Sequence, residues 1–365
     1  MIATAMVDRG WDIDVYFGFD GPLVDRMKSD RCSTHVAEHR NWLRSAGLVR
    51  FARNLRAEYL VSSVFEQAFR RTCPDIVYVN TLVSYAAAVA AVRLKIPVIW
   101  HVRELFSDDR GELVWPASIV KPFIRRKITK LATTVVVNSC AVASNVFGVG
   151  NCVDVENVPN AAGPEFFGPR GDSTESRRKL GLPAGVPLIG LPGTLRRVKG
   201  HRFLFGAIPR ILERVPDCQF AITGAIDSHF AQSLVAAAQE KPLAGRVVFT
   251  GAIGDMLSFY HACDACCVPS LSEPFGRTAI ECFATRTPVV ASAVGGLTEI
   301  VHDDENGLSV PSGDESALAD ALVSLLNDQP RRCRLVKQAA ADADDRYTYT
   351  AYTERVASIV NNVLN

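Results

Sequence analysis

Short apolar runs rich in β-branched residues alternate with helical stretches along almost the whole of this 365-residue chain. Such alternation is typical of βα units, in which crossover helices connect parallel strands. The strands expected in the first half are residues 13–17, 76–79, 97–101 and 134–138. A second series is expected at residues 187–192, 219–223, 247–250, 265–269, 288–291 and 307–310. The chain is therefore predicted to be an α/β protein with two parallel sheets.

The two series are separated by a segment rich in Pro and Gly. We predict a Rossmann-like domain over residues 1–162, a linker over 163–186 and a second Rossmann-like domain over 187–338. The remaining segment, 339–365, contains an amphipathic helix near residues 347–363 that is expected to pack back onto the first domain. Because open α/β sheets bind ligands beyond the carboxyl ends of their strands, the two domains are expected to face each other across a cleft.

The charges nearly balance, with 40 Lys plus Arg against 39 Asp plus Glu and a net charge of +1. This balance excludes whole-chain electrostatics as a basis for nucleic acid binding, so any bound anion must be held by a local cluster. The amino-terminal residues lack the pattern of a signal peptide, and no apolar run suits a membrane span. Both features favour a cytoplasmic protein.

The ten cysteines are scattered along the chain. Only Cys263, Cys266 and Cys267 form a cluster, and their C-x-x-C spacing suits zinc or redox chemistry in principle. No second pair of ligands stands at a suitable distance, and the cluster lies in an apolar run. Buried thiols at a helix-to-strand transition are the favoured interpretation, and no metal site is predicted.

The most informative stretch is residues 270–281, which follows one expected strand and opens a helix. Pro274 and Gly276 form the turn, and the amino terminus of the helix offers free backbone N–H groups to a diphosphate. Glu281 lies about two turns beyond Glu273, where its carboxylate can accept hydrogen bonds from both hydroxyls of a ribose. Glu273 is placed for a second sugar ring. Taken alone, an N-capping acid and a solvated helix acid explain the two glutamates more simply.

A second cluster, residues 191–200, also lies between an expected strand and a helix. Arg196, Arg197 and Lys199 place three cations within four positions, beside Gly193 and Gly200. In a chain of near-zero net charge, this concentration suggests a phosphate clamp, with Lys as a point charge and Arg as a bidentate donor. A solvated loop is the simpler explanation if the cluster stands alone.

These two clusters, together with residues 158–160 and 99–104, resemble the retaining GT-B-fold glycosyltransferases of family four. The resemblance covers nearly the whole chain, and its most specific part is Pro-Ser-x-x-Glu-Pro-Phe-Gly-x4-Glu over residues 269–281, followed by residues 288–299. It implies two Rossmann-like domains facing a cleft and transfer of a sugar, with retention, from a UDP-, GDP- or ADP-sugar. The implied acceptor is a glycan, a lipid-linked molecule or a small molecule in cell-surface polysaccharide or glycoconjugate synthesis.

The same resemblance assigns roles to single residues. The catalytic residues it implies are His101, which contacts the transferring sugar, Glu273 and Lys199. Lys199 would neutralise the leaving diphosphate as charge develops on it, without a covalent nucleophile, a metal or a cofactor. The implied donor-binding residues are Gly193, Thr194, Arg196, Arg197, Lys199, Gly251, Ile253, Glu273, Phe275, Gly276 and Glu281. Thr194 stands where many members of the family have Arg, and Gly251 and Ile253 correspond to the loop that contacts the base.

Residues 121–130 carry five cations and no acid: Lys121, Arg125, Arg126, Lys127 and Lys130. Together with Trp115, they could dock on an anionic membrane at its cytoplasmic face, as a lipid-linked acceptor would favour. A solvated helix face that keeps the protein soluble is the alternative.

Members of the family normally begin with a short apolar strand and a glycine-rich loop, whereas this chain begins within the helix that follows, at residues 1–10. That first strand is usually central, so its absence is expected to leave two unpaired inner edges. We expect a protein starting at Met1 to be unstable or poorly active, and about 25 to 30 upstream residues, one βα unit, to restore both properties. The alternative function is a non-catalytic nucleotide-sugar-binding or scaffold protein that lost turnover with this loop.

Overall fold

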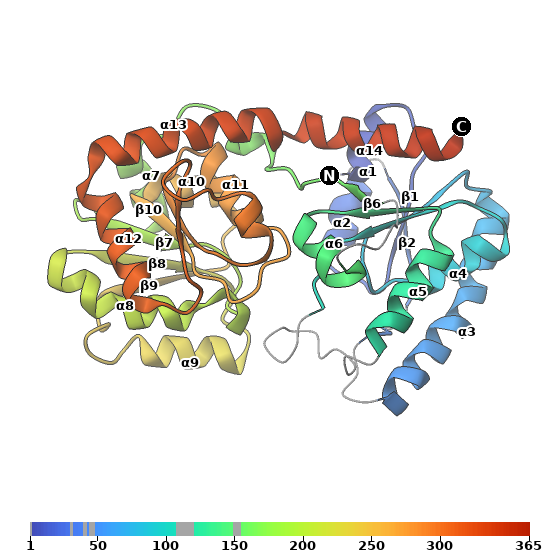
Figure 1. The fold of residues 1–365 in the computed structure, drawn as a ribbon, viewed down its shortest axis with the longest axis horizontal. Coiled ribbons are helices and arrows are strands. Elements are labelled where there is room, and N and C mark those ends of the chain that lie inside the picture. The colour runs from blue at the N-terminus through green and yellow to red at the C-terminus, as the bar shows by residue number, and fades with distance from the viewer. Residues whose placement is uncertain (1, 30–31, 39–41, 44–47, 107–119, 149–154) are drawn as a thin grey trace. The chain divides into compact units, whose positions relative to one another are not determined.

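The computed structural model describes residues 2–29, 32–38, 42–43, 48–106, 120–148 and 155–365. The chain forms two compact units (Figure 1). The first runs to Pro159 and also contains Thr350–Asn365, and the second is Asn160–Tyr349. Both units consist of parallel strands covered by helices, which confirms the predicted α/β class.

The first unit contains two parallel sheets among its described residues. β1 pairs with β2, and the other sheet has the order β3-β4-β5-β6. The strands are β1 (Asp14–Phe17), β2 (Ser33–Val36), β3 (Val77–Val79), β4 (Val98–Val102), β5 (Thr134–Val137) and β6 (Val155–Asn157). No described strand pairs with the second edge of β1 or β3, so the divided sheet expected from the sequence is observed. β2 and β6 were not predicted, because they are short and not buried.

The first unit contains seven helices among its described residues, and α3 and α4 share its hydrophobic core. The seven helices are α1 (Ile2–Asp8), α2 (Pro22–Ser29), α3 (Leu48–Thr72), α4 (Tyr85–Arg93), α5 (Lys121–Leu131), α6 (Cys140–Phe147) and α14 (Tyr349–Leu364). α4 is rich in alanine, so its backbone approaches α3 closely. Glu58 of α3 is fully buried there and accepts a hydrogen bond from the backbone N–H of Ala86, in the first turn of α4. A carboxylate at this end of a helix is stabilised by the helix dipole.

The second unit has one six-stranded parallel sheet of order β12-β11-β10-β7-β8-β9. The strands are β7 (Leu188–Leu191), β8 (Gln219–Thr223), β9 (Val247–Gly251), β10 (Ala265–Val268), β11 (Val289–Ser292) and β12 (Leu308–Val310), each of which the sequence predicted. The central strands are buried throughout, as expected for a parallel sheet covered on both faces. The strand order reverses between the neighbours β7 and β10, which makes the carboxyl ends of these two strands the expected ligand position.

Helices lie on both faces of this sheet (Figure 1). They are α7 (Ser173–Leu180), α8 (His201–Arg214), α9 (His229–Ala237), α10 (Met256–Ala262), α11 (Arg277–Ala284), α12 (Glu315–Asn327) and α13 (Gln329–Arg346), with 3-10 turns η2 (Pro164–Phe166), η3 (Arg197–Lys199) and η4 (Gly295–Glu299). α8 packs against α12, and α10 packs against α7.

Residues 163–186 are not the linker that their Pro and Gly content indicated, because they fold as part of the second unit. Arg177 of α7 is buried and forms an ion pair of 2.9 Å with Asp264, and it donates to the backbone oxygen of Val186 at 2.7 Å. Arg170 donates to the backbone oxygens of His261 and Cys263 at the end of α10, and to Arg286 and Thr287 just after α11. Such long-range anchoring through arginine leaves no local signal in the sequence.

The carboxy-terminal segment forms two helices, α13 and α14, where the sequence indicated one near residues 347–363. The break lies at Tyr347, whose backbone oxygen accepts a hydrogen bond of 3.0 Å from Ala162. Both partners belong to the second unit, whereas residues Thr350–Asn365 belong to the first.

The clustered cysteines lie at the transition from α10 to β10, as predicted. Cys263, Cys266 and Cys267 are fully buried, and burial raises the pKa of each thiol. They therefore act as small core side chains. Across the described part of the chain, no helix is both long and apolar enough to cross a bilayer.

Candidate functional site

Two loops meet at the carboxyl ends of β7 and β10, where the sheet order reverses. Leu271, after β10, donates its backbone N–H to the oxygen of Val198 at 2.8 Å. Gly200 has a φ of +73°, and a Cβ at this position would lie only 1.8 Å from the backbone oxygen of Pro269. Only glycine permits this close approach. The two sequence clusters that suggested phosphate and sugar binding are therefore packed against each other.

Lys199 and Glu273 form the polar centre of these joined loops. The Nζ of Lys199 lies 2.8 Å from Oε2 of Glu273, and the hydroxyl of Ser270 donates to the same oxygen at 3.3 Å. Glu273 is only 7% exposed. An ion pair with so little solvent around it is stronger than a surface pair, and it holds the carboxylate in one orientation. The sequence did not single out Ser270 as a partner of Glu273.

The glycine pair of the second signature segment, residues 288–299, supports the loop of Glu273 from the other side. Gly296 donates its N–H to the backbone oxygen of Glu273 at 2.9 Å. A Cβ on Gly295 would lie 2.1 Å from that oxygen, and one on Gly296 would lie 2.5 Å from the Cα of Phe275. Phe275 is buried between these segments. The spacing of the signature thus reflects backbone packing around Glu273.

Helix α11 starts directly after this loop. Gly276 is its N-cap residue with a φ of +113°, and no side chain caps the helix by a hydrogen bond. Glu281 lies on the same helix, where Oε2 accepts a hydrogen bond of 2.6 Å from the hydroxyl of Tyr260 and Oε1 lies 3.2 Å from Nε of Arg277. Burial raises the pKa of Glu281, and Tyr260 and Arg277 oppose that shift. Tyr260 was not predicted, because no spacing connects it to the motif.

Glycines at the ends of β7, β8 and β9 bring the remaining predicted positions together. Gly193 exchanges hydrogen bonds with the hydroxyl of Thr223, with its N–H at 2.9 Å from that oxygen. Gly224 donates to the oxygen of Gly251 at 2.9 Å. Thr194 is exposed beside Gly193. Ile253 packs against the core of the second unit, which leaves the backbone of its loop as the polar group available to a ligand.

The two arginines before Lys199 are both exposed. Arg197 lies over the ring of Phe230 in α9, 5.1 Å from its centroid, and Arg202 contacts the same ring at 5.9 Å. This cation–π contact directs Arg197 toward α9. Arg196 is the N-cap residue of η3, and its N–H bonds to the oxygen of Thr194 at 2.9 Å.

His101 belongs to the first unit, unlike the other predicted site residues. It lies in β4 and is fully buried, with Nδ1 2.7 Å from the hydroxyl of Tyr78. Its Nε2 has no hydrogen-bond partner among the described residues. Burial, helped by Arg103, holds the pKa of His101 well below its usual value, so the imidazole is neutral at pH 7.

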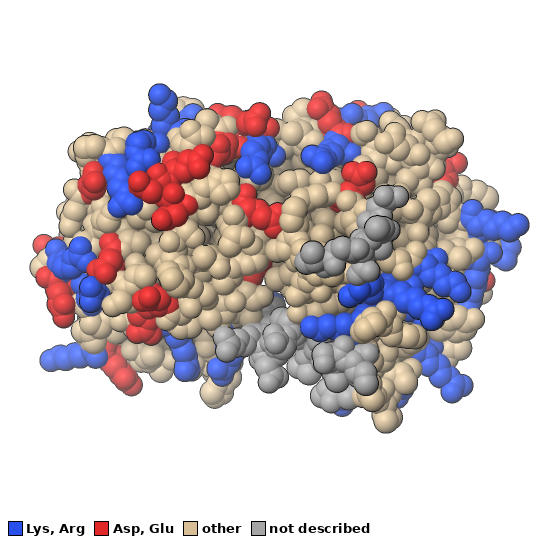
Figure 2. Space-filling view, viewed as in Figure 1, with Lys and Arg blue, Asp and Glu red and all other residues tan. Residues whose placement is uncertain are grey.

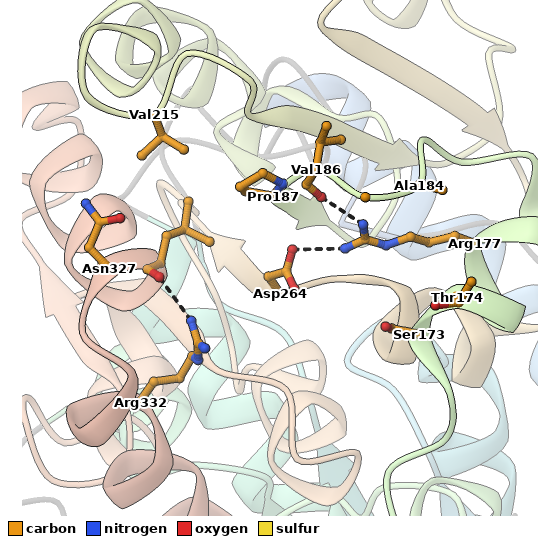
Figure 3. Close-up of a pocket in the computed structure, with 12 residues that line it drawn as sticks. Ser173, Thr174, Arg177, Ala184, Val186, Pro187, Val215, Asp264, Asn327 and Arg332 are labelled. Carbon is orange, nitrogen blue, oxygen red and sulfur yellow. Dashed lines mark hydrogen bonds and ion pairs between the residues drawn. The ribbon is translucent and has the colours of Figure 1, made fainter.

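In the second unit, a pocket of about 410 Å³ opens at the end of the sheet opposite to the joined loops of Lys199 and Glu273 (Figure 3). It lies beside the amino-terminal ends of β7 and β10, where Pro187 and Asp264 line it. Figure 3 shows the pair Arg177–Asp264 on one side and Arg332, bonded to backbone oxygens at the end of α12, on the other. None of the predicted site residues lines this pocket.

Comparison with known proteins covers both units. Residues 1–161 match the glycosyl transferase 4-like domain, and residues 172–342 match glycosyl transferases group 1. A D-inositol 3-phosphate glycosyltransferase of Stackebrandtia nassauensis is 36% identical over 201 residues, 53% of this chain and 45% of that protein. A protein of the same name from Corynebacterium glutamicum is 32% identical over 57% of this chain and 51% of its own length. The matched region thus spans about half the length of these curated relatives.

Solved structures share the fold over almost the full chain. HepE of Anabaena in complex with UDP-glucose has a TM-score of 0.83 at 21% identity, covering 99% of this chain and 94% of HepE. Sucrose-phosphate synthase of Thermosynechococcus elongatus has a TM-score of 0.80 at 22% identity, covering 99% and 91%. Both family models and these folds agree with the resemblance found in the sequence. The chain belongs to the glycosyl transferases group 1, with the GT-B fold.

Proposed function

We propose that this protein transfers a sugar, with retention of configuration, from a nucleotide-sugar donor to an acceptor hydroxyl. The observation that carries the proposal is the Lys199–Glu273 pair, held in joined loops at the strand-order reversal of the second unit. Ligands of open parallel sheets bind at such a position. HepE, which shares the fold, was crystallised with UDP, with UDP and glucose, and with UDP-glucose. A UDP-sugar is therefore the donor we propose first, ahead of GDP- and ADP-sugars.

The proposed reaction requires the protein to stabilise a leaving diphosphate. Cleavage of the glycosidic C–O bond leaves negative charge on the phosphate oxygens, and preorganised donors lower the energy of that state. Lys199 supplies a cation, and the backbone N–H groups at the start of α11, which no side chain caps, supply dipoles. Arg196 or Arg197, both exposed beside Lys199, would supply a second cation. Glu273 orients Lys199 and approaches the donor sugar.

The ribose is assigned to Glu281. Its carboxylate is fixed by Tyr260 and Arg277, and the remaining lone pairs can accept the two hydroxyl protons of a ribose. The backbone around Gly251 and Ile253 would contact the base. His101 is proposed to contact the transferring sugar, as the family resemblance implies. These assignments need neither a metal nor a cofactor.

The acceptor is proposed as a glycan, a lipid-linked molecule or a small molecule. The name of the relatives described above, D-inositol 3-phosphate glycosyltransferase, supports a phosphorylated polyol as the first acceptor to test. We place the reaction in polysaccharide or glycoconjugate synthesis at the cytoplasmic face of the membrane. The five cations of 121–130, on α5, would hold the protein there by charge attraction. Trp115, which the sequence grouped with them, lies outside the described residues.

A thermal-shift screen against UDP-, GDP- and ADP-sugars tests the proposal. A donor present at 100 times its dissociation constant should stabilise the protein by about 2.7 kcal/mol. The donor that binds is then incubated with inositol phosphate, and transfer of labelled sugar is measured. Binding without transfer to any acceptor would favour the non-catalytic alternative. No shift with any donor, in a protein with a cooperative melting transition, would contradict the assignment of the site.

A further inference from the structure

Helix α3 exposes large apolar side chains on the face that points away from the core. Val49 is 86% exposed, Leu60 63% and Val64 52%. With Arg53 and Arg56, these residues recur at spacings of three and four, so all five share one face of the helix. We call this set, Val49, Arg53, Arg56, Leu60 and Val64, the outer face of α3.

The opposite face of the same helix already supplies the core. Phe51, Phe65 and Phe69 are buried there and belong to the hydrophobic cluster of the first unit. The exposed apolar residues therefore do not replace core contacts. Twenty-five residues of helix present one apolar face to the protein and a second, mixed apolar and basic face to solvent. Among the described residues, the hydrophobic core of the unit does not include Val49, Leu60 or Val64 of this second face.

Helix α5 packs beside the amino-terminal end of α3 and contacts it through Phe51, on the core-facing side of α3. The rings of Phe51 and Phe123 lie 6.1 Å apart in an edge-on contact, and Phe123 itself is partly exposed. In Figure 2 the basic side chains gather over this part of the first unit. The cations that these neighbouring segments of α3 and α5 carry are Arg50, Arg53, Arg56, Lys121, Arg125, Arg126, Lys127 and Lys130. Residues 48–57 and 121–131 contain no Asp or Glu, and none of these eight cations forms an ion pair with a described residue.

We propose that the outer face of α3 lies in the surface of an anionic lipid bilayer, with Val49, Leu60 and Val64 among the acyl chains and the arginines at the headgroups. A helix that carries basic and apolar residues on one exposed face binds a membrane in this way, through apolar burial together with attraction to anionic lipids. The inference rests on the membrane partner proposed above for α5. It adds the inserting element, since α5 alone offers charge with only one exposed ring.

Two other occupants fit this surface less well. A second copy of the chain would bring eight like charges against eight, which is unfavourable without intervening acids. A nucleic acid would neutralise the cations, but it would leave Val49, Leu60 and Val64 facing phosphates and water. An anionic lipid surface satisfies the charged and the apolar parts together.

The first test places a fluorescent reporter on the proposed inserting face. Leu60→Trp is compared with Leu364→Trp, whose parent residue is 47% exposed at the carboxyl end of α14. Each protein is mixed with phosphatidylglycerol–phosphatidylcholine vesicles that contain brominated acyl chains. We expect added quenching, relative to the unsubstituted protein, for Leu60→Trp only. Equal quenching of both variants, or of neither, would overturn the inference.

The second test separates α3 from α5. Val49→Ser, Leu60→Ser and Val64→Ser are combined, and vesicle co-sedimentation is expected to weaken at least tenfold, whereas Leu364→Ser leaves it unchanged. These are exposed positions, so an unchanged melting temperature checks the fold. If the triple variant binds like the wild type while neutralising the five α5 cations releases the protein, the inference fails and the proposed function survives. If the wild type binds no vesicles, the inference fails, and so does the membrane partner named in the proposed function.

A second copy of the chain and a nucleic acid, the two other occupants, can be tested with the same wild type and triple variant. Lipid-free sedimentation would detect a dimer that the triple variant loses, and titration with duplex DNA would detect binding with the same dependence on Val49, Leu60 and Val64. Either result would overturn the lipid assignment. Binding of UDP, measured in parallel, should be equal in wild type and triple variant, which keeps this test independent of the donor site.

Discussion

Replacing Gly200 by alanine should separate the two loops that form the candidate donor site. The backbone at Gly200 has a φ of +73°, and the added Cβ would lie 1.8 Å from the backbone oxygen of Pro269. An ordinary contact begins at 3.4 Å, so one of the two backbones must move. The hydrogen bond from Leu271 to Val198, at 2.8 Å, joins the same two loops and would be lost.

The magnitude follows from two contributions. The left-handed conformation costs an alanine about 1–2 kcal/mol relative to glycine. The backbone overlap adds about 1–3 kcal/mol, the usual range for overpacking. Gly245 separates the two contributions, because its φ is +74° and no atom lies within 4 Å of an added Cβ. Gly245→Ala should therefore show only the conformational part.

Calorimetric melting of both variants measures the difference. For a unit the size of Asn160–Tyr349, each kcal/mol corresponds to about 2–4 °C. An extra loss of about 2 kcal/mol in Gly200→Ala should therefore lower its melting temperature by roughly 4–8 °C more than Gly245→Ala. UDP binding should weaken in Gly200→Ala alone. Equal melting temperatures and equal UDP affinities in the two variants would refute the argument that close backbone contact builds the site.

Three further predictions concern single side chains of the second unit. Burial raises the pKa of Glu281, so the stability that this group contributes is complete below its ordinary pKa and is lost as the pH rises through its pKa in the folded state. Glu281→Gln should therefore melt higher than the wild type at pH 7, lose that advantage near pH 4, and bind UDP more weakly. A higher melting temperature that persists at pH 4 would contradict a raised pKa. Burial lowers the pKa of His201 to about 4, so between pH 6.5 and 4 the free energy of unfolding should fall by about 3 kcal/mol more in the wild type than in His201→Leu. Urea unfolding measures this difference, and parallel curves of unfolding free energy against pH would exclude the linkage. Lys199→Met should reduce the transfer rate about a hundredfold or more, whereas Lys179→Met, which removes the surface pair with Asp255, should leave it unchanged; matching rates would remove Lys199 from the reaction.

The strands of the second unit were predictable because most of them are short apolar runs bounded by turn residues. Buried parallel strands leave this local signature, and all six strands were found, including the half-buried β9. β2 and β6 were not predicted because they are short and none of their residues is buried, so their sequences resemble loops. The segment 163–186 was misassigned for a related reason: Arg170 and Arg177 hold it by bonds to residues about 90 or more positions away, and composition cannot report such partners.

The candidate site divides in the same way. Lys199 and Glu273 were expected near each other because each lies in a loop that follows a strand of the second sheet, and the structure brings them into contact, while their roles and that of Glu281 stay predictions. Tyr260 was not predictable, since its hydroxyl reaches Glu281 from another helix. The divergence of the two neighbouring arginines, with Arg197 drawn over Phe230, also depends on a helix that the motif does not contain.

The assignment of ribose to Glu281 is tested most directly by titration calorimetry with UDP and with 2′,3′-dideoxy-UDP. Hydrogen bonds to a charged group contribute about 1.5–3 kcal/mol, so the wild type should bind UDP about ten- to a hundredfold more tightly than the dideoxy compound. In Glu281→Ala this ratio should fall to about one, with the dideoxy compound bound as in the wild type. A ratio that is the same in both proteins would contradict the donor site described for the second unit.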